Sequence, residues 1–324
     1  MRGLFKLIFI CISLLFGGSV FASRSIQVYL YPSNVILKKG EVIGVVVRGD
    51  FELESVSLED KLYFSPYKIG EGTFYSLVPI PHTVLTNFNL GLRLTDGEEF
   101  YTNLVIPIEV VVDPISYAKR KPKVIKDIVV SNSFVVKTNR FSFYGDLFSE
   151  FVGNKFITTF CSPFPNSEDI ISEIKDGYGV NRSRGGIISG RIHLGVDIPK
   201  AWGTKVFSVF DGIVISTGKD RRAGKFVAVY HGYGISSVYM HLSKILVRKG
   251  QYITTNDIIG LVGSTGRSTG AHLHFGVSIN GIYVDPVSFF KNDYSPFSII
   301  SNGLVYEFNF AQMELGSGSL VYHE

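Results

Sequence analysis

Toward its C-terminal end the chain contains the stretch Gly263-Ser264-Thr265-Gly266-Arg267-Ser268-Thr269-Gly270-Ala271-His272-Leu273-His274-Phe275. The glycine, serine and threonine residues predict a turn-rich loop that leads into a strand. His272 and His274 are two residues apart, so on a strand both side chains point to one face of the sheet. One imidazole can then bind a metal ion while its neighbour acts on a water molecule held there. An isolated His-x-His is a weak signal, and the rest of the chain decides its meaning.

Five of the seven histidines lie between positions 193 and 274. A spacing of four residues is expected to place His193 and Asp197 on one face of either a strand or a helix. A neutral imidazole and a carboxylate are suitable zinc ligands, and the His272/His274 pair offers a third. Two histidines and one aspartate leave a tetrahedral zinc with one position for water, which is the arrangement of a catalytic site.

A hydrolase also needs a proton acceptor for that water. The chain contains no His-Glu-x-x-His motif, so the glutamate base of helical zinc proteases is missing. An imidazole titrates near neutral pH and can accept or donate a proton there. His241, at the end of an expected strand over residues 237–240, and His272 are therefore the predicted pair.

Several separate motifs, in this order, resemble those of the LytM/lysostaphin-type zinc metallopeptidases, a family that cuts peptide crosslinks of bacterial peptidoglycan. They are His193-x-x-x-Asp197, Tyr239-Met240-His241-Leu242-Ser243 and the stretch 263–275, with further matches at 195–198, 259–263 and 284–286. The resemblance covers about residues 165–290. It implies a central antiparallel sheet with loops that wall a narrow groove for extended stem peptides.

The resemblance also implies a role for each motif residue. His193, Asp197 and His274 become the ligands of one zinc ion, and His241 and His272 become the catalytic histidines. These two would orient and deprotonate the attacking water and stabilise the oxyanion.

One part of the chain departs from the family pattern. Family members commonly carry Phe-Gly-x-Arg upstream of the first ligand, whereas this chain has Tyr178-Gly179-Val180-Asn181-Arg182, with the arginine displaced by one residue. A glycine-rich loop over 183–191 follows. The departure leaves the substrate preference open but not the metal binding.

The N-terminus predicts a secretory signal over residues 1–22. Arg2 and Lys6 are followed by an apolar run, Leu7 to Phe16, which is too short to span a bilayer. Val20-Phe21-Ala22 fits a cleavage site before Ser23, and an uncleaved membrane anchor is the alternative. Cleavage leaves Cys161 as the sole cysteine, which excludes an internal disulfide and a zinc site built on several cysteines.

The remaining sequence predicts a mainly β protein, with 45% hydrophobic and 14% aromatic residues. Residues 23–113 are expected to form an immunoglobulin-like β-sandwich, with strands at 26–30 and 42–47 and a hairpin turn at 96–97. A connector over 114–163 contains the basic stretch 118–123, either a solvated linker or a contact with an anionic polymer or membrane.

The peptidase-like domain is expected over 164–290 and a C-terminal extension over 291–324. Within the domain, strands are expected at 205–210, 226–230 and 274–279, a hairpin turn at Asn280-Gly281 and a short helix over 167–174. The extension contains one further strand candidate and has no assigned role.

These features predict an exported zinc metalloendopeptidase of the periplasm or cell envelope that cuts peptidoglycan, with D-Ala crosslinks favoured and glycine bridges as an option. Loss of the signal lowers the formal net charge from +4 by two. The remaining positive charge is too small to indicate nucleic-acid binding. Membrane contact is expected only through an uncleaved signal, and no protein partner is indicated. The alternatives are a non-catalytic regulator of cell-wall amidases and, from the strand rhythm of 247–260, a lipoyl-type carrier domain. Amidase regulators lack one or more zinc ligands, whereas all of them are present here. Carrier domains need a modified lysine and work inside the cell, which disagrees with the predicted signal.

Overall fold

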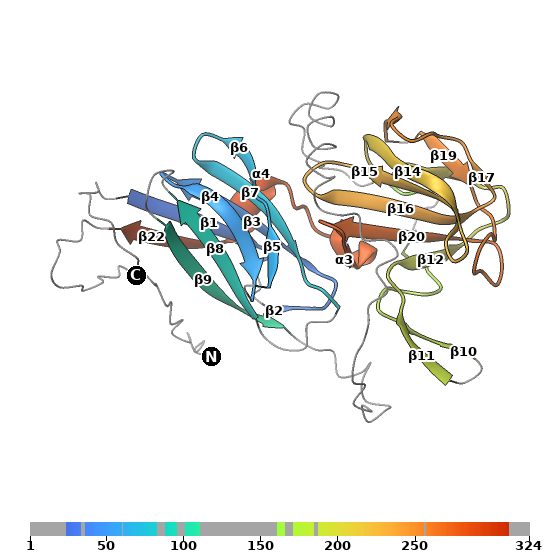
Figure 1. Ribbon diagram of the computed structural model, residues 1–324, viewed down its shortest axis with the longest axis horizontal. Coiled ribbons are helices and arrows are strands. Elements are labelled where there is room, and N and C mark those ends of the chain that lie inside the picture. The colour runs from blue at the N-terminus through green and yellow to red at the C-terminus, as the bar shows by residue number, and fades with distance from the viewer. Residues whose placement is uncertain are drawn as a thin grey trace.

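The chain folds into two β-rich units joined by a C-terminal segment (Figure 1). The computed structural model describes residues 24–33, 36–59, 61–82, 88–95, 101–110, 161–165, 171–184, 187–255 and 257–310. The expected signal, the turn at 96–97, most of the connector, the start of the expected helix over 167–174 and the last 14 residues lie outside these ranges. No helix in the described ranges is both long and apolar enough to cross a membrane.

The first unit is a sandwich of two five-stranded sheets. One sheet has the order β22-β1-β3-β7-β6, with β1 Arg24–Tyr31, β3 Val42–Gly49, β6 Tyr67–Gly70, β7 Thr73–Pro79 and β22 Leu304–Phe310. The other has the order β2-β9-β8-β4-β5, with β2 Ile36–Leu37, β4 Glu52–Leu58, β5 Leu62–Phe64, β8 Phe88–Thr95 and β9 Tyr101–Val110. Both sheets contribute to one apolar core. The mainly β class is confirmed, and the immunoglobulin-like topology stays a prediction.

The second unit is built on a seven-stranded sheet. Its order is β12-β20-β16-β15-β14-β18, with β21 paired to β20; the bounds are β12 Val196–Pro199, β14 Gly212–Asp220, β15 Gly224–Tyr230, β16 Ile235–Leu242, β18 Tyr252–Ile253, β20 His272–Ile279 and β21 Ile282–Val284. A small sheet holds β13 Lys205–Phe207, β17 Lys244–Ile245 and β19 Ile258–Leu261, and a separate hairpin holds β10 Asn181–Arg184 and β11 Ile187–Ile192. All pairings in this unit are antiparallel among the described strands.

Most of the expected strands are confirmed, as is the hairpin at Asn280-Gly281. Both turn residues have positive φ, 50° and 82°, and they join β20 to β21 as a two-residue loop of the expected kind does. The strand expected over 205–210 is wrong in length, because β13 ends at Phe207. Ser208 leaves the sheet and its hydroxyl donates to the carbonyl of Phe210, which turns the buried chain away from the strand path.

The segment after the second unit returns to the first. Helix α3 (Pro286–Phe290) begins at Asp285, whose carboxylate accepts from the amide of Val287. Helix α4 (Pro296–Asn302) packs against β1 and β3. β22 then pairs with residues 24–30 of β1 and adds an edge strand to the sandwich. The described part of the C-terminal extension therefore packs with both units, and the predicted domain boundaries themselves stay predictions.

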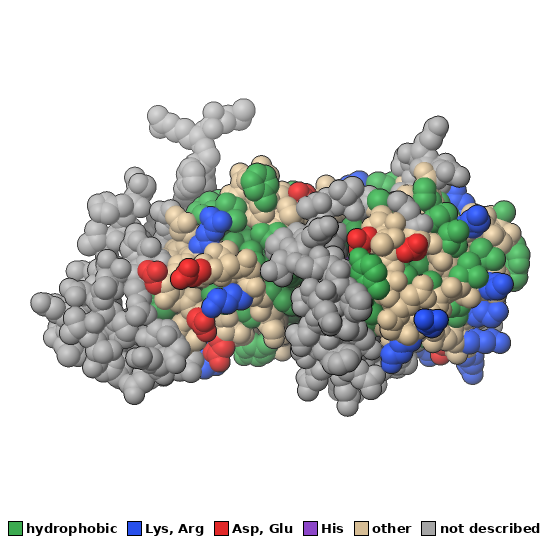
Figure 2. Space-filling model, turned by 90° about the horizontal axis from the view of Figure 1, so that it is seen from above, with side chains coloured by type: hydrophobic (Ala, Val, Ile, Leu, Met, Phe, Trp, Pro, Cys, Tyr) green, Lys and Arg blue, Asp and Glu red, His purple; other side chains and the backbone are tan. Residues whose placement is uncertain are grey.

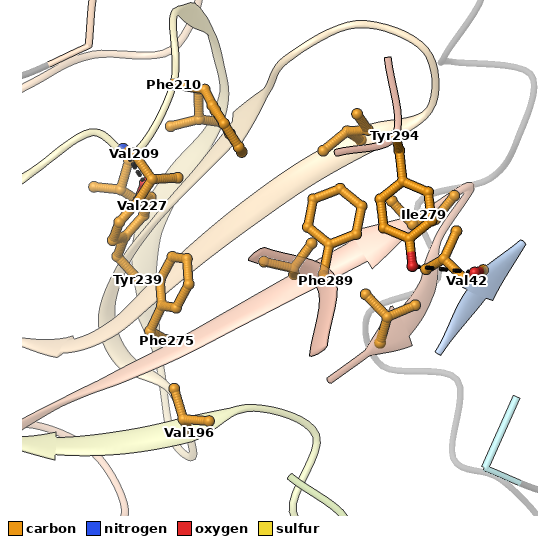
Figure 3. Packing of buried hydrophobic residues seen from close by; sticks show 14 of the residues in the cluster. Val42, Val196, Val209, Phe210, Val227, Tyr239, Phe275, Ile279, Phe289 and Tyr294 are labelled. Carbon is orange, nitrogen blue, oxygen red and sulfur yellow. Dashed lines mark hydrogen bonds between the residues drawn. The ribbon is translucent and has the colours of Figure 1, made fainter. Parts of the chain in front are cut away.

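A continuous core joins the two units. Alternate residues of β3 face different cores: Val45 and Val47 point into the sandwich, whereas Val42 and Val46 pack with residues of the second unit. Burial on both faces explains why residues 42–47 form an apolar run rather than an alternating one. Tyr294, which follows α3, donates its hydroxyl to the carbonyl of Val42 at 3.1 Å, as Figure 3 shows.

Candidate metal centre

Three neighbouring strands bring four of the five candidate site residues together. β20 lies between β12 and β16, and in this register Asp197 faces His274 on one side while Met240 faces it on the other. His241 follows Met240 directly, and His272 is paired with Pro199 on β12. The antiparallel register thus gathers residues that are more than 70 positions apart in the sequence at one end of the sheet.

The donor atoms of His193, Asp197 and His274 converge on one another. His193 Nε2 lies 3.0 Å from Asp197 Oδ1 and 2.9 Å from His274 Nδ1, and His274 Nδ1 lies 2.8 Å from the same carboxylate oxygen. All three residues are buried. Among the described residues they form the one group of at least three such side chains with the geometry to hold a metal ion.

The predicted reason for the proximity of His193 and Asp197 is wrong. The two residues do not share a strand or a helix, because His193 lies after β11 and Asp197 lies within β12. The chain bends between them at Leu194-Gly195. A Cβ atom at Gly195 would lie 2.5 Å from the carbonyl oxygen of Phe275 and 2.8 Å from the His274 ring, so this bend against β20 has no room for a side chain.

Hydrogen bonds set the ring nitrogen that His193 offers to the centre. Its Nδ1 donates to the carbonyl of Gly177 at 2.8 Å, which leaves Nε2 of the neutral ring with a lone pair. Burial alone would raise the pKa of Asp197, but the neighbouring rings of His193 and His274 hold that pKa well below its usual range. Two imidazoles and one anionic carboxylate, all buried and converging, are a donor set that fits Zn²⁺.

His272 lies beside this group with one nitrogen free. Its Nδ1 donates to the carbonyl of Gly270 at 2.8 Å and lies 3.2 Å from Ser268 Oγ. Its Nε2 is buried, has no hydrogen-bond partner and lies 3.8 Å from Asp197 Oδ1. In the neutral tautomer this buried nitrogen is an acceptor, and it faces the converging ligands.

His241 is held in the same way from the neighbouring strand. Its Nδ1 donates to the carbonyl of Thr265 at 2.8 Å, and its ring centroid lies 4.8 Å from that of His272. The backbone of His241 has φ of 62°, a left-handed conformation that costs of the order of 1 kcal/mol in a non-glycine residue. Burial lowers the pKa of His241 to about 4, so its ring is neutral at pH 7.

All five predicted site residues thus meet in one place, while other candidates do not join them. His231 is fully buried and lies 2.7 Å from Ser237 Oγ and 2.8 Å from the carbonyl of Asp211, which makes it a core residue. Tyr239 is also buried and its hydroxyl accepts from the amide of Val209, so it does not line a surface. Sequence reasoning missed the carbonyls that orient the histidines, since any residue type can supply a carbonyl.

Comparisons with known proteins match the part of the chain that holds this centre. Residues 191–286 match the model of Peptidase family M23. The chain is 44% identical over 89 residues to peptidoglycan DD-endopeptidase ShyA of Vibrio cholerae, which covers 28% of this chain and 21% of that protein. It is 41% identical over 98 residues to DD-carboxypeptidase/endopeptidase Mpg of Neisseria meningitidis, which covers 30% of this chain and 23% of that protein.

Among solved structures, the catalytic domain of the antimicrobial peptidase lysostaphin from Staphylococcus simulans is 34% identical, with a TM-score of 0.34. The match covers 38% of this chain and 96% of that domain. The chain spans less than a quarter of the length of the two curated relatives.

Proposed function

We propose that this chain, whose residues 191–286 form a Peptidase family M23 domain, is a zinc-dependent endopeptidase that hydrolyses the peptide crosslinks of bacterial peptidoglycan. One observation carries the proposal: the donor atoms of His193, Asp197 and His274 converge, and the acceptor nitrogen of His272 lies buried and unpartnered beside them. The similarity to ShyA, a peptidoglycan DD-endopeptidase, supports this substrate class and favours D-Ala crosslinks over glycine bridges. Such a substrate requires export to the periplasm or cell envelope, in line with the predicted signal.

Zn²⁺ bound by the three ligands would polarise the scissile carbonyl and lower the pKa of a bound water molecule. The rings of His241 and His272 supply the proton acceptor. Each ring donates through Nδ1 to a backbone carbonyl, so each presents Nε2 as a lone pair. A proton taken up by one of these rings creates an imidazolium next to the developing oxyanion, where its charge stabilises the transition state.

Two histidines rather than one fit the need for a proton donor later in the reaction. Amide hydrolysis leaves an amine that must be protonated as the carbon–nitrogen bond breaks. The ring centroids of His241 and His272 are 4.8 Å apart, so one ring can stabilise the oxyanion while the other passes the proton to the leaving amine. The site therefore performs acid–base chemistry without a glutamate.

The test uses the chain from residue 23 onward. We expect one equivalent of zinc by elemental mass spectrometry and release of new amine termini from purified peptidoglycan. Mass spectrometry of the digested muropeptides identifies the bond, with cleavage at D-Ala crosslinks expected and walls containing glycine bridges as the comparison. His274→Ala should lack both zinc and cleavage.

Bound zinc without new amine termini across several wall types would overturn the enzyme assignment. In that case, stimulation of a purified cell-wall amidase by the same preparation would establish the regulator in its place.

A further inference from the structure

A short segment of the second unit holds two of the candidate ligands through its backbone. We call residues 175–180 the ligand strap. The amide of Asp197 donates to the carbonyl of Asp176, and the amide of Lys175 donates to the carbonyl of Asp197. The strap thus runs alongside the first residues of β12 and fixes the backbone of the Asp197 ligand.

The strap makes hydrogen bonds to both the backbone and the ring of His193. The amide of Gly179 donates to the carbonyl of His193 at 2.8 Å, and the amide of His193 donates to the carbonyl of Val180 at 2.9 Å. The carbonyl of Gly177 accepts from His193 Nδ1, so the strap also orients the ring. A shift of residues 177–180 would move His193 and alter the direction of its Nε2 lone pair.

Tyr178 is the strap side chain that contacts the rest of the protein away from the candidate ligands. Lys175, Asp176 and Val180 are exposed, and a Cβ at Gly177 would meet no atom within 4 Å. The Tyr178 hydroxyl instead donates to the carbonyl of Tyr283 at 2.9 Å, and burial raises its pKa, so it remains a donor.

The Tyr178 ring packs against the sandwich. A Cβ at Gly40, in the turn before β3, would lie 2.5 Å from Tyr178 Cε1, so the ring fills the space above this glycine. His82 of the sandwich is a second neighbour, with its ring centroid 6.1 Å from that of Tyr178. The carbonyl of Gly40 also accepts from the amide of Asp285 at 2.8 Å, which fixes the turn to the second unit.

We propose that Tyr178 is a positioning residue through which the docked sandwich controls how tightly the centre holds its metal. The inference rests on the proposed zinc site. The chain of contacts runs from Gly40 to the Tyr178 ring, from that ring to the strap backbone, and from Gly177 to the His193 ring. The N-terminal unit thereby acts on metal retention without contacting a ligand.

The experiment measures the rate of zinc release to a chromogenic chelator from the full chain. Gly40→Ala pushes a methyl group into the Tyr178 ring, and we expect zinc to be released about tenfold faster, at the lower end of the effects of outer-shell changes. Gly250→Ala is the matched control: both glycines have φ above 80°, at 86° and 82°, but a Cβ at Gly250 meets nothing within 4 Å. The two variants share the backbone strain, and only one displaces Tyr178.

A second pair of variants leaves the sandwich unchanged. Tyr178→Ala removes the ring and should release zinc at the faster rate, whereas Tyr178→Phe keeps the packing and should restore a rate within about twofold of the parent. Circular dichroism of the metal-free proteins checks that each variant is folded.

Equal release rates for the Gly40→Ala and Gly250→Ala proteins, with Tyr178→Ala unchanged, would overturn the coupling. This outcome is separate from a failure of the proposed function. A chain that holds zinc but cuts no peptidoglycan refutes the endopeptidase and still reports the coupling through its release rates.

Discussion

His272 and His274 differ in what surrounds them, although both belong to β20. His274 Nδ1 lies 2.8 Å from Asp197 and the residue is buried, so this ring nitrogen is directed at the other candidate ligands. His272 is bound through Nδ1 to the loop that precedes the strand, and its Nε2 is left without a partner. Neighbouring groups, and not the residue type, therefore distinguish the roles that we propose for the two histidines.

The His241→Ala substitution tests this division. The His241 ring is tied to Thr265 and donates no atom to the converging ligand group, so the variant should keep its zinc. Turnover on muropeptides should fall by about 10²–10⁴, the range for loss of one general acid–base group. Elemental analysis and steady-state kinetics measure the two effects. Near-normal turnover with full zinc content would refute a two-histidine mechanism.

At the scale of elements, β15 and β16 enclose a buried polar network. His231, which follows β15, bridges the carbonyl of Asp211 and the hydroxyl of Ser237, and Ser237 Oγ lies 3.1 Å from the Tyr239 hydroxyl. Each of these three side chains is almost completely buried. Burial lowers the pKa of His231 from 6.5 to about 4, so the folded protein keeps this ring uncharged.

This network predicts a pH dependence of stability. Between pH 6.5 and about 4 the unfolded state binds a proton at His231 that the folded state does not. Above pH 6.5 His231 is neutral in both states and does not reduce the free energy of unfolding. As the pH falls from 6.5 toward 4, protonation of the unfolded state lowers the free energy of unfolding by about 3 kcal/mol in total.

The measurement compares urea unfolding of the metal-free parent and a His231→Gln variant from pH 7 to 4. The parent should lose more unfolding free energy over this range than the variant, whose residue 231 does not titrate. Parallel curves for the two proteins would show that His231 does not cause the slope.

At the scale of the molecule, residues 286–310 tie the two units together. Tyr294 donates to Val42 and its carbonyl accepts from Tyr75, both in the sandwich. Ile299 of α4 is fully buried and packs on Gly44, where a Cβ would lie 2.6 Å from its side chain. The described surface carries Lys and Arg side chains at the end of the second unit away from the sandwich (Figure 2).

Truncation after Phe290 should therefore destabilise the sandwich as well as the junction. Loss of the buried Tyr294 and Ile299 side chains removes about 5 kcal/mol of apolar burial. This corresponds to a fall of about 20–40 °C in the thermal midpoint of a unit of roughly 100 residues. Loss of β22 also exposes β1 as an edge strand, which favours association.

Calorimetry and light scattering measure these effects. The matched control ends at Phe310 and keeps every described element, so it separates the loss of α4 and β22 from the loss of the last 14 residues. Equal midpoints for the two truncated chains would show that the segment does not tie the units together.

The sequence alone led to the five residues that meet at the candidate centre, because histidine and aspartate are chemically distinctive and stand in recognisable motifs. It also predicted β20 and its turn, since Asn280-Gly281 suits positive φ in a two-residue loop. It failed where shape decides: the strand at 205–210 is shorter than expected, and the bend at Gly195 replaces a shared element for His193 and Asp197. The domain limits rest on composition, and the described residues do not include most of the connector.

What the sequence by itself determined is the chemistry available: which side chains can hold a metal, which can carry a proton, and that the chain is mainly β. Only the tertiary structure decided which nitrogen of each histidine faces the centre, that β22 completes the N-terminal sheet, and that Tyr178 joins the sandwich to the ligand strap. The physical reason is that local patterns record side-chain type and strand periodicity. Backbone carbonyls and contacts between distant segments depend on packing, and no residue type encodes them.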